Sequence, residues 1–139
     1  MIQQNSSKSP GHITGIGGIF LRSSQVDRMN DWYSQSLGLD IGPYGVVFPW
    51  KQHDDPDQAG ATCWNIMDKD DRYFLVEGQS YMVNYRVDHL ALLLEKLKKQ
   101  GIETLKPVET HEFGSFAWIL DPDGNQIELW EPVDQALGL

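Results

Sequence analysis

Cysteine is almost absent from this 139-residue sequence, which contains Cys63 alone. An intrachain disulfide therefore cannot form, and this composition fits a reducing compartment. Cys63 lies in the strand-like run 61–66 (Ala-Thr-Cys-Trp-Asn-Ile), where a buried, unreactive thiol is a better interpretation than a nucleophile. We accordingly expect a cytoplasmic protein.

Basic residues are also scarce, with 11 lysines and arginines against 20 aspartates and glutamates and a formal net charge of -9. Such a chain is poorly suited to bind nucleic-acid phosphates or an anionic membrane through its overall charge. No apolar run of about 18 residues is present to cross a bilayer. The N-terminus is polar and lacks the apolar core of a secretory signal, so residues 1–11 are expected to form a tail.

The first half of the sequence contains a strand pattern followed by a helix pattern. Residues 13–22 are predicted to form a strand, and Ser24 and Asp27 have the spacing of a capping box at a helix start. Gly38 is predicted to end this helix, because glycine readily adopts positive φ. The apolar residues at helical spacing are Val26, Met29, Trp32, Tyr33 and Leu37.

The second half repeats this order. Residues 81–87 are predicted to form a strand, Asp88 is a plausible helix N-cap, and Gly101 is predicted to end the helix. The apolar stripe of this helix consists of Leu90, Leu93, Leu94 and Leu97. Gly101 lies 63 positions after Gly38 (101 − 38), which indicates an internal duplication with a period near half the chain.

Further strand-like segments follow each predicted helix. They are residues 39–41, 44–50, 62–67 and 73–76 in the first half, and 103–108, 113–120 and 126–130 in the second. The last two are joined by residues 121–125 (Asp-Pro-Asp-Gly-Asn), a turn sequence in which proline presets φ and Gly124 accepts the left-handed conformation. The predicted order of elements is therefore βαβββ, twice.

This order and several motifs resemble the glyoxalase / bleomycin-resistance / extradiol-dioxygenase superfamily, also called vicinal-oxygen-chelate proteins, in its glyoxalase-like branch. The motifs are Trp32-Tyr33, Leu37-Gly38-Leu39, Asn84-Tyr85-Arg86-Val87-Asp88 and the closing run from Asp121 to Pro132. The resemblance implies an α+β fold in which two βαβββ modules, about residues 12–77 and 81–132, form a curved mixed eight-stranded sheet around a cleft. Residues 133–139 are then expected to be a C-terminal tail.

The resemblance also implies where a divalent metal would bind, because superfamily enzymes take its ligands from the first and last strands of each module. The family's usual histidine positions fall on Gly18 and Met82, and neither side chain suits such a metal. Glu128 matches the glutamate position of the last strand, and Glu77 is a weaker candidate for the matching position in the first module. Because a metal site needs three or four ligands, we expect no resident metal, with a divalent cation as the alternative.

Glu128 is the residue that the sequence favours most for a role in the cleft. It alternates with Ile127 and Leu129, so it faces the cleft if those two pack under the helices. A buried carboxylate without a metal needs hydrogen bonds or a cation, or its pKa rises. The functional interpretation is a general base or a substrate anchor, and the alternative is a structural carboxylate.

Four more residues are candidates for binding a substrate. Arg86 lies in an inner strand and needs a partner, for which Glu128 or a substrate carboxylate or phosphate would serve. Trp64 and Trp118 are candidates for an aromatic pocket wall, although packing in the core is the simpler interpretation of each. His111 precedes a strand at a sheet end, where it would border the cleft.

These patterns support a protein of the bleomycin-resistance kind, which binds a small molecule without the usual metal. Because members of the superfamily commonly dimerise, the resemblance also implies a homodimer. The alternative is a metal-dependent lyase, isomerase or dioxygenase of the lactoylglutathione-lyase type, which the fold and Glu128 favour. A purely interacting domain is a third reading. Whether the protein is an enzyme, and which ligand it takes, the sequence leaves open.

Overall fold

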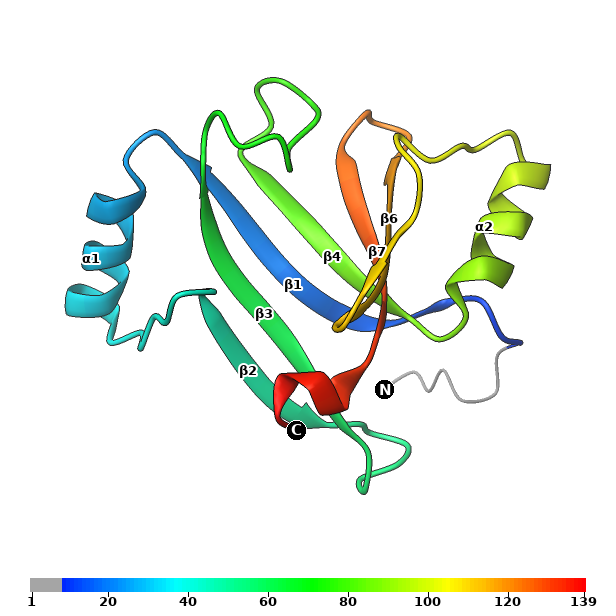
Figure 1. The fold of residues 1–139 in the computed structure, drawn as a ribbon, viewed down its shortest axis with the longest axis horizontal. Coiled ribbons are helices and arrows are strands. Elements are labelled where there is room, and N and C mark those ends of the chain that lie inside the picture. Colours follow the sequence, from blue (N-terminus) through cyan, green and yellow to red (C-terminus); the bar gives the residue numbers. More distant parts are fainter. Residues whose placement is uncertain (1–8) are drawn as a thin grey trace.

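The computed structural model describes residues 9–139, which form one mixed seven-stranded sheet with two α-helices and a 3-10 helix (Figure 1). The elements are β1 (Ile13–Ser23), α1 (Val26–Leu37), β2 (Val46–Lys51), β3 (Ala59–Asp68), β4 (Tyr81–Val87), α2 (Leu90–Lys99), β5 (Glu109–His111), β6 (Gly114–Leu120), β7 (Gln126–Pro132) and η1 (Asp134–Leu137). The strand order across the sheet is β2-β3-β1-β4-β7-β6-β5. The predicted α+β class is confirmed.

Two modules with the same internal arrangement meet at the centre of this sheet. The first strand of each runs parallel to its last strand, as β1 does to β3 and β4 does to β7. Antiparallel pairing of β1 with β4 joins the modules. Figure 1 shows α1 and α2 at opposite ends of the curved sheet. Each module therefore forms one half of the sheet, and the pairing of the central strands β1 and β4 joins the two halves.

The predicted count of eight strands is too high by one. Residues 39–41 form no strand, since Gly42 and Gly45 pair only with each other in an isolated bridge. Residues 73–76 are also irregular, because the Gln126 side chain takes the hydrogen-bonding groups of their backbone: it accepts from Leu75 N at 2.6 Å and donates to Tyr73 O at 2.9 Å. Residues 103–108 are irregular too, and the short β5 forms just after them.

The helices occupy the predicted ranges but begin differently from the prediction. The N-cap of α1 is Gln25, with no side-chain cap, and Ser23 Oγ accepts a hydrogen bond from Gln25 N at 3.0 Å. Gly38 ends α1 at φ 75°, as predicted. The N-cap of α2 is His89, and Asp88 accepts the His89 N–H at 2.9 Å. The amphipathic pattern located both helices, whereas their first residues follow from local backbone geometry.

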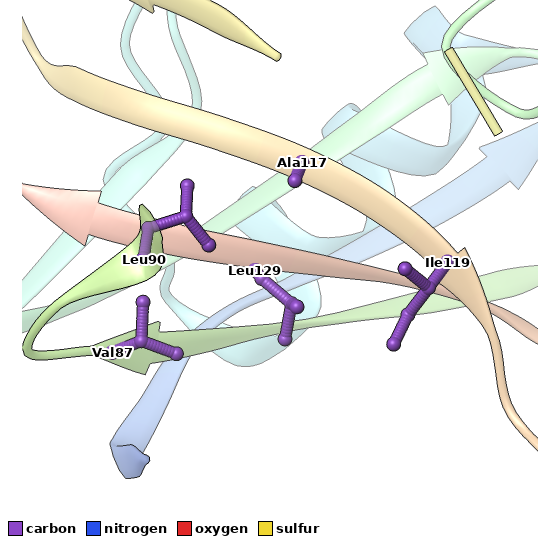
Figure 2. Close-up of a cluster of buried hydrophobic side chains, with 5 residues drawn as sticks. All are labelled: Val87, Leu90, Ala117, Ile119 and Leu129. Atoms are coloured by element: carbon purple, nitrogen blue, oxygen red, sulfur yellow. The ribbon is translucent and has the colours of Figure 1, made fainter. Parts of the chain in front are cut away.

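The hydrophobic core of the second module lies between its strands and α2. Figure 2 shows this cluster, which consists of Val87, Leu90, Ala117, Ile119 and Leu129. Burial of each such aliphatic side chain contributes roughly 1.5–3 kcal/mol. A second cluster on the opposite face of the sheet contains Phe74, Met82 and Trp118. Since side chains alternate along a strand, Glu128 lies on the face of the second cluster.

The two expected tails differ in what the structure shows of them. Of residues 1–11, positions 1–8 lie outside the described residues, while Gly11 is buried and donates its N–H to Asp88 at 2.8 Å. Residues 133–139 contain η1, red in Figure 1, which contacts β3. Val133 N bonds Phe113 O at 3.0 Å just before it. No helix within residues 9–139 is long and apolar enough to cross a membrane.

Candidate functional site

A cavity of about 350 Å³ opens on the face of the sheet that carries Glu128. Its aromatic lining residues are Phe20, Tyr44, Tyr73, Phe113, Phe116 and Trp130, and the others are Gly17, Val47, Cys63, Asn84, Glu128, Ala136 and Leu137. Strands from both modules, the loop after β3 and η1 all contribute. A mainly apolar wall with a few convergent polar groups is the usual character of a small-molecule site.

Glu128 is held at the cavity floor by three hydrogen-bond donors. Its Oε2 accepts from the Tyr73 hydroxyl and from Trp118 Nε1, the latter at 2.7 Å, and its Oε1 accepts from Asn84 Nδ2. Strand register brings the strand residues together, because Asn84 and Trp118 are the direct neighbours of Glu128 on β4 and β6. The residue has 0% of its surface exposed, so these bonds replace its entire hydration.

Burial dominates the acid–base properties of this floor. It raises the pKa of Glu128, and the hydrogen bonds from Tyr73, Asn84 and Trp118 offset part of that rise. Burial also raises the pKa of Tyr73, and the neighbouring Glu128 raises it further. Tyr73 thus keeps its proton and acts as a donor, whereas Glu128 is the group at the floor that can exchange one.

Asn84 carries an unused hydrogen-bond acceptor. Its Nδ2 bonds Glu128, while its Oδ1 is buried and has no hydrogen-bond partner among the described residues. Gly17 on β1 lies against this oxygen, and a Cβ at that position would collide with it. A glycine is therefore required beside the carboxamide. The floor combines a carboxylate that accepts three hydrogen bonds with one unpaired carbonyl oxygen, and that unpaired oxygen costs stability unless something else pairs with it.

Arg86 has a different partner from the one expected. Rather than Glu128 or a free space for a substrate anion, it meets Asp134 of η1 in a two-pronged ion pair, with N–O distances of 2.9 and 2.6 Å. Its guanidinium carbon lies 5.1 Å from the ring centroid of Trp50 and 5.5 Å from that of Trp130. Arg86 therefore fastens η1, which supplies Ala136 and Leu137 to the cavity wall.

The two tryptophans named as wall candidates lie on opposite faces of the sheet. Trp118 is buried beneath the cavity, where it donates to Glu128 and has Lys106 Nζ 4.2 Å from its ring centroid. Trp64 instead faces α1, with its ring 4.8 Å from that of Tyr33. Its neighbour Cys63 lines the cavity, and burial raises the pKa of that thiol, so it stays protonated.

The remaining candidates lie at the edge of the site or outside it. His111 is exposed on β5 and stacks on Phe116 with ring centroids 4.8 Å apart. Because Phe116 lines the cavity, His111 forms the outer layer of that wall. Glu77 is exposed in the loop that follows β3. The structure thus brings Glu128 and Trp118 together, adds His111 through Phe116, and separates Trp64 and Glu77 from them.

The residues present do not fit a divalent metal of the kind that the superfamily resemblance implies. Gly18 has no side chain, and Met82 is fully buried in the apolar cluster. Phe20 pairs with Asn65 as Asn84 pairs with Glu128, so the position matching Glu128 in the first module is Asn65. The groups around Glu128 point N–H and O–H donors at its two oxygens, which occupies positions that a metal ion would need. Within residues 9–139 no group of three or more His, Cys, Asp or Glu could hold a metal ion.

Sequence reasoning missed three residues that build the site. The sequence pattern predicts a strand around Tyr73 and a tail around Asp134, and neither prediction brings the residue near Glu128. Asn84 belongs to a motif that carries the resemblance, but the motif does not indicate a role for its side chain. Strand alternation could have found it, because Asn84 and Met82 share a face of β4. No comparable periodic signal exists for Tyr73 and Asp134, which lie in irregular segments.

Paired modules around a cleft define a class of proteins that the sequence comparison identifies directly. The family described as Glyoxalase/Bleomycin resistance protein/Dioxygenase superfamily matches residues 10–129. The chain belongs to this family. A search of curated proteins gave no match.

Solved structures with similar folds have low sequence identity to this chain. Methylmalonyl-CoA epimerase from Mycobacterium tuberculosis is 15% identical with a TM-score of 0.64, over 98% of this chain and 99% of that one. A Streptomyces coelicolor methylmalonyl-CoA epimerase variant is 14% identical with a TM-score of 0.64, over 88% and 99%. The Mn(II)-bound glyoxalase from Novosphingobium aromaticivorans is 17% identical with a TM-score of 0.61, over 93% and 41%. At these identities the similarity establishes the fold alone.

Proposed function

We propose that this protein binds a small organic molecule in the cavity above Glu128 and does so without a resident metal. The observation that carries the proposal is the polar floor at Glu128, surrounded by an aromatic wall. Apolar walls supply affinity through burial, and a few fixed polar groups supply orientation. The cavity volume of about 350 Å³ is near the lower end for ligand sites, which favours a small ligand.

Each site residue then has a defined role. Glu128 anchors the ligand, and its burial-raised pKa also suits a general base if the bound molecule reacts. Tyr73 and Trp118 hold the carboxylate in place. Arg86 positions η1 over the cavity through Asp134, and His111 supports the outer wall through Phe116. Trp64 packs under α1 and has a structural role.

The metal-dependent lyase, isomerase or dioxygenase is the alternative function. The family and its Mn(II)-bound glyoxalase neighbour favour it, but the donor set does not, because Gly18, Met82 and Asn65 occupy the matching positions. Elemental analysis of the purified protein distinguishes the two functions. We expect less than about 0.1 equivalent of Ni, Zn, Mn or Fe. One equivalent that chelators remove together with an activity would contradict the metal-free proposal.

A thermal-shift screen of a chemically mixed small-molecule library tests binding itself. A ligand in excess over its Kd raises the melting temperature by mass action. We expect the shift produced by the hits to shrink in Glu128→Gln and to persist in Glu77→Gln, a matched control that makes the same change at an exposed loop position. Hits that shift both variants equally would place the binding site elsewhere. Homodimerisation stays a prediction, which light scattering on the same protein tests.

A further inference from the structure

The groups that donate hydrogen bonds at the cavity floor all donate to the same residue, Glu128. The Tyr73 hydroxyl, Trp118 Nε1 and one of the two N–H groups of Asn84 Nδ2 donate to Glu128, so these three donor hydrogens are already used. A carboxylate accepts about four hydrogen bonds, and the unused capacity of Glu128 is on Oε1, the oxygen beside Asn84. Asn84 Oδ1 is unpaired as well. The floor therefore has acceptors to offer and needs a partner that donates.

The charge of Glu128 is also left without a counterion. Among residues 9–139 the ion pairs are His12–Asp88, Arg86–Asp134 and Lys106–Glu109, and none of them includes Glu128. Arg86 is committed to Asp134 on both guanidinium nitrogens. Lys106 lies behind the Trp118 ring and pairs with Glu109 at 2.8 Å. A positive charge brought into the cavity would meet a buried carboxylate that is compensated by hydrogen bonds and by the charge of Lys106, but that has no ion-pair partner of its own.

The walls favour a cation for a separate reason. Phe116 and Trp130 stack with ring centroids 5.8 Å apart and planes within 8°, and Phe20 meets Tyr73 edge to face at 5.9 Å. The face of an aromatic ring attracts positive charge through its quadrupole, most strongly where water is excluded. Trp130 already interacts in this way with Arg86 on one side. The rings of Phe20, Tyr73, Phe116 and Trp130 line the cavity, and the body of an organic cation would pack against them.

We propose that the ligand is a small organic cation whose charged nitrogen carries N–H donors, such as an amine, an amidine or a guanidine on an aromatic or aliphatic body. The nitrogen donates to Glu128 Oε1 and to Asn84 Oδ1, and the body packs between the aromatic walls. This inference rests on the proposed function and adds the chemical class of the ligand. A carboxylate or phosphate would instead face the charge of Glu128 with Arg86 already engaged. A quaternary ammonium would leave Asn84 Oδ1 unpaired.

Four probes that share one phenylethyl body test the class by isothermal titration calorimetry. They are phenethylamine, 2-phenylethanol, 3-phenylpropionate and trimethyl(phenethyl)ammonium. We expect the amine to bind about tenfold or more tightly than the alcohol, because a charge-assisted hydrogen bond is roughly twice as strong as a neutral one. The quaternary ammonium is expected between them, and the carboxylate is expected to bind most weakly.

Two variants connect the preference to the floor. Glu128→Gln keeps the shape of the side chain and removes its charge, so the ratio of amine to alcohol affinity should fall toward one. Glu77→Gln removes the same charge from an exposed loop and should leave the ratio unchanged. Because the ratio is measured within one protein, a general loss of stability in Glu128→Gln does not produce the result. An unchanged ratio in Glu128→Gln would overturn the inference.

The failure of the inference and the failure of the proposed function have different signatures. If the alcohol or the carboxylate binds as tightly as the amine, the ligand class is wrong and the cavity remains a binding site. The same holds if none of the four probes binds while library hits are neutral or anionic. If neither the probes nor the library yields binding that depends on Glu128, both proposals fail.

Discussion

The two modules share one architecture, yet only the strands of the second place hydrogen-bonding side chains on the polar floor, which the first module reaches through Tyr73 in the loop after β3. Asn84 pairs with Glu128 across β4 and β7 as Phe20 pairs with Asn65 across β1 and β3, so the residues corresponding to Asn84 and Glu128 are Phe20 and Asn65. The strands of the first module therefore contribute a ring and small residues to the cavity, the loop after β3 contributes the Tyr73 hydroxyl, and the second module contributes the other hydrogen-bonding groups of the floor. Strand pairing uses backbone groups, so it leaves the side chains at these positions free to differ. One module can therefore carry the polar groups of the site while both modules keep the same backbone arrangement.

The modules agree, in contrast, in how they use one arginine. Arg22 and Arg86 lie 64 positions apart (86 − 22), and each fastens the segment that follows the last strand of its module. Arg22 donates to Lys69 O at 2.7 Å and Val76 O at 3.2 Å, which holds the loop carrying Tyr73. Arg86 holds η1 through Asp134. Both irregular segments that complete the cavity are thus attached to the sheet by corresponding side chains.

The largest effect is expected at Trp118, the neighbour of Glu128 on β6. Trp118→Ala should lower the free energy of unfolding by about 3–5 kcal/mol, because it empties a fully buried site and removes a donor to Glu128. Chemical denaturation measures the loss. The control is Trp32→Ala on α1, where the side chain is half exposed and the expected loss is much smaller. Equal losses would mean that the second module is no more sensitive than the first.

A smaller effect is expected from the two arginines, and it tests their correspondence. Arg86→Met should cost about 2 kcal/mol of unfolding free energy, since it leaves the partly exposed Asp134 without its partner. Arg22→Met should cost about 1–2 kcal/mol through lost hydrogen bonds to carbonyl oxygens. The decisive measurement is amide hydrogen exchange, which should accelerate in residues 133–137 for Arg86→Met and in residues 69–76 for Arg22→Met. Acceleration of both segments in both variants would contradict separate attachment.

The smallest effect concerns the pH dependence of stability, to which Glu128 contributes and Asn65 cannot. Burial raises the pKa of Glu128 in the folded state, so the unfolded chain loses this proton at lower pH than the folded chain does. The contribution of Glu128 to stability is therefore highest below the ordinary glutamate pKa and falls as pH rises through the folded-state pKa. Denaturation curves across pH should show Glu128→Gln gaining on the wild type as pH increases. Glu77→Gln should run parallel to the wild type, and a parallel course for Glu128→Gln would contradict the shift.

Local patterns were sufficient to predict most of the fold. The alternation of Ile127, Glu128 and Leu129 placed the carboxylate on the cavity face, and Gly38 correctly marked the end of α1. Of the predicted strands that do not form, residues 73–76 show the reason most clearly, because their apolar composition is typical of a strand whichever way the backbone is paired. That pairing depends on Gln126, which lies about 50 residues away in the sequence and gives no local signal.

The site was harder to predict for a related reason. Glu128 was identified because a family motif and a periodic pattern agree at that position. Its partners are set by tertiary structure: Tyr73 by a loop that Arg22 holds, and Asp134 by an ion pair with a residue 48 positions earlier. The expectation that Arg86 pairs with Glu128 failed because strand register places Asn84, rather than Arg86, opposite Glu128.

The stacked rings along the cavity wall include Trp130, whose fluorescence is expected to respond to a bound molecule. His111 stacks on Phe116, Phe116 stacks on Trp130, and the Arg86 guanidinium lies between the indoles of Trp130 and Trp50. The line runs from an exposed histidine on β5, one edge strand of the sheet, to β2 at the other edge. A molecule that enters beside Phe116 changes the polarity around Trp130, so the intrinsic indole emission registers occupancy without a label.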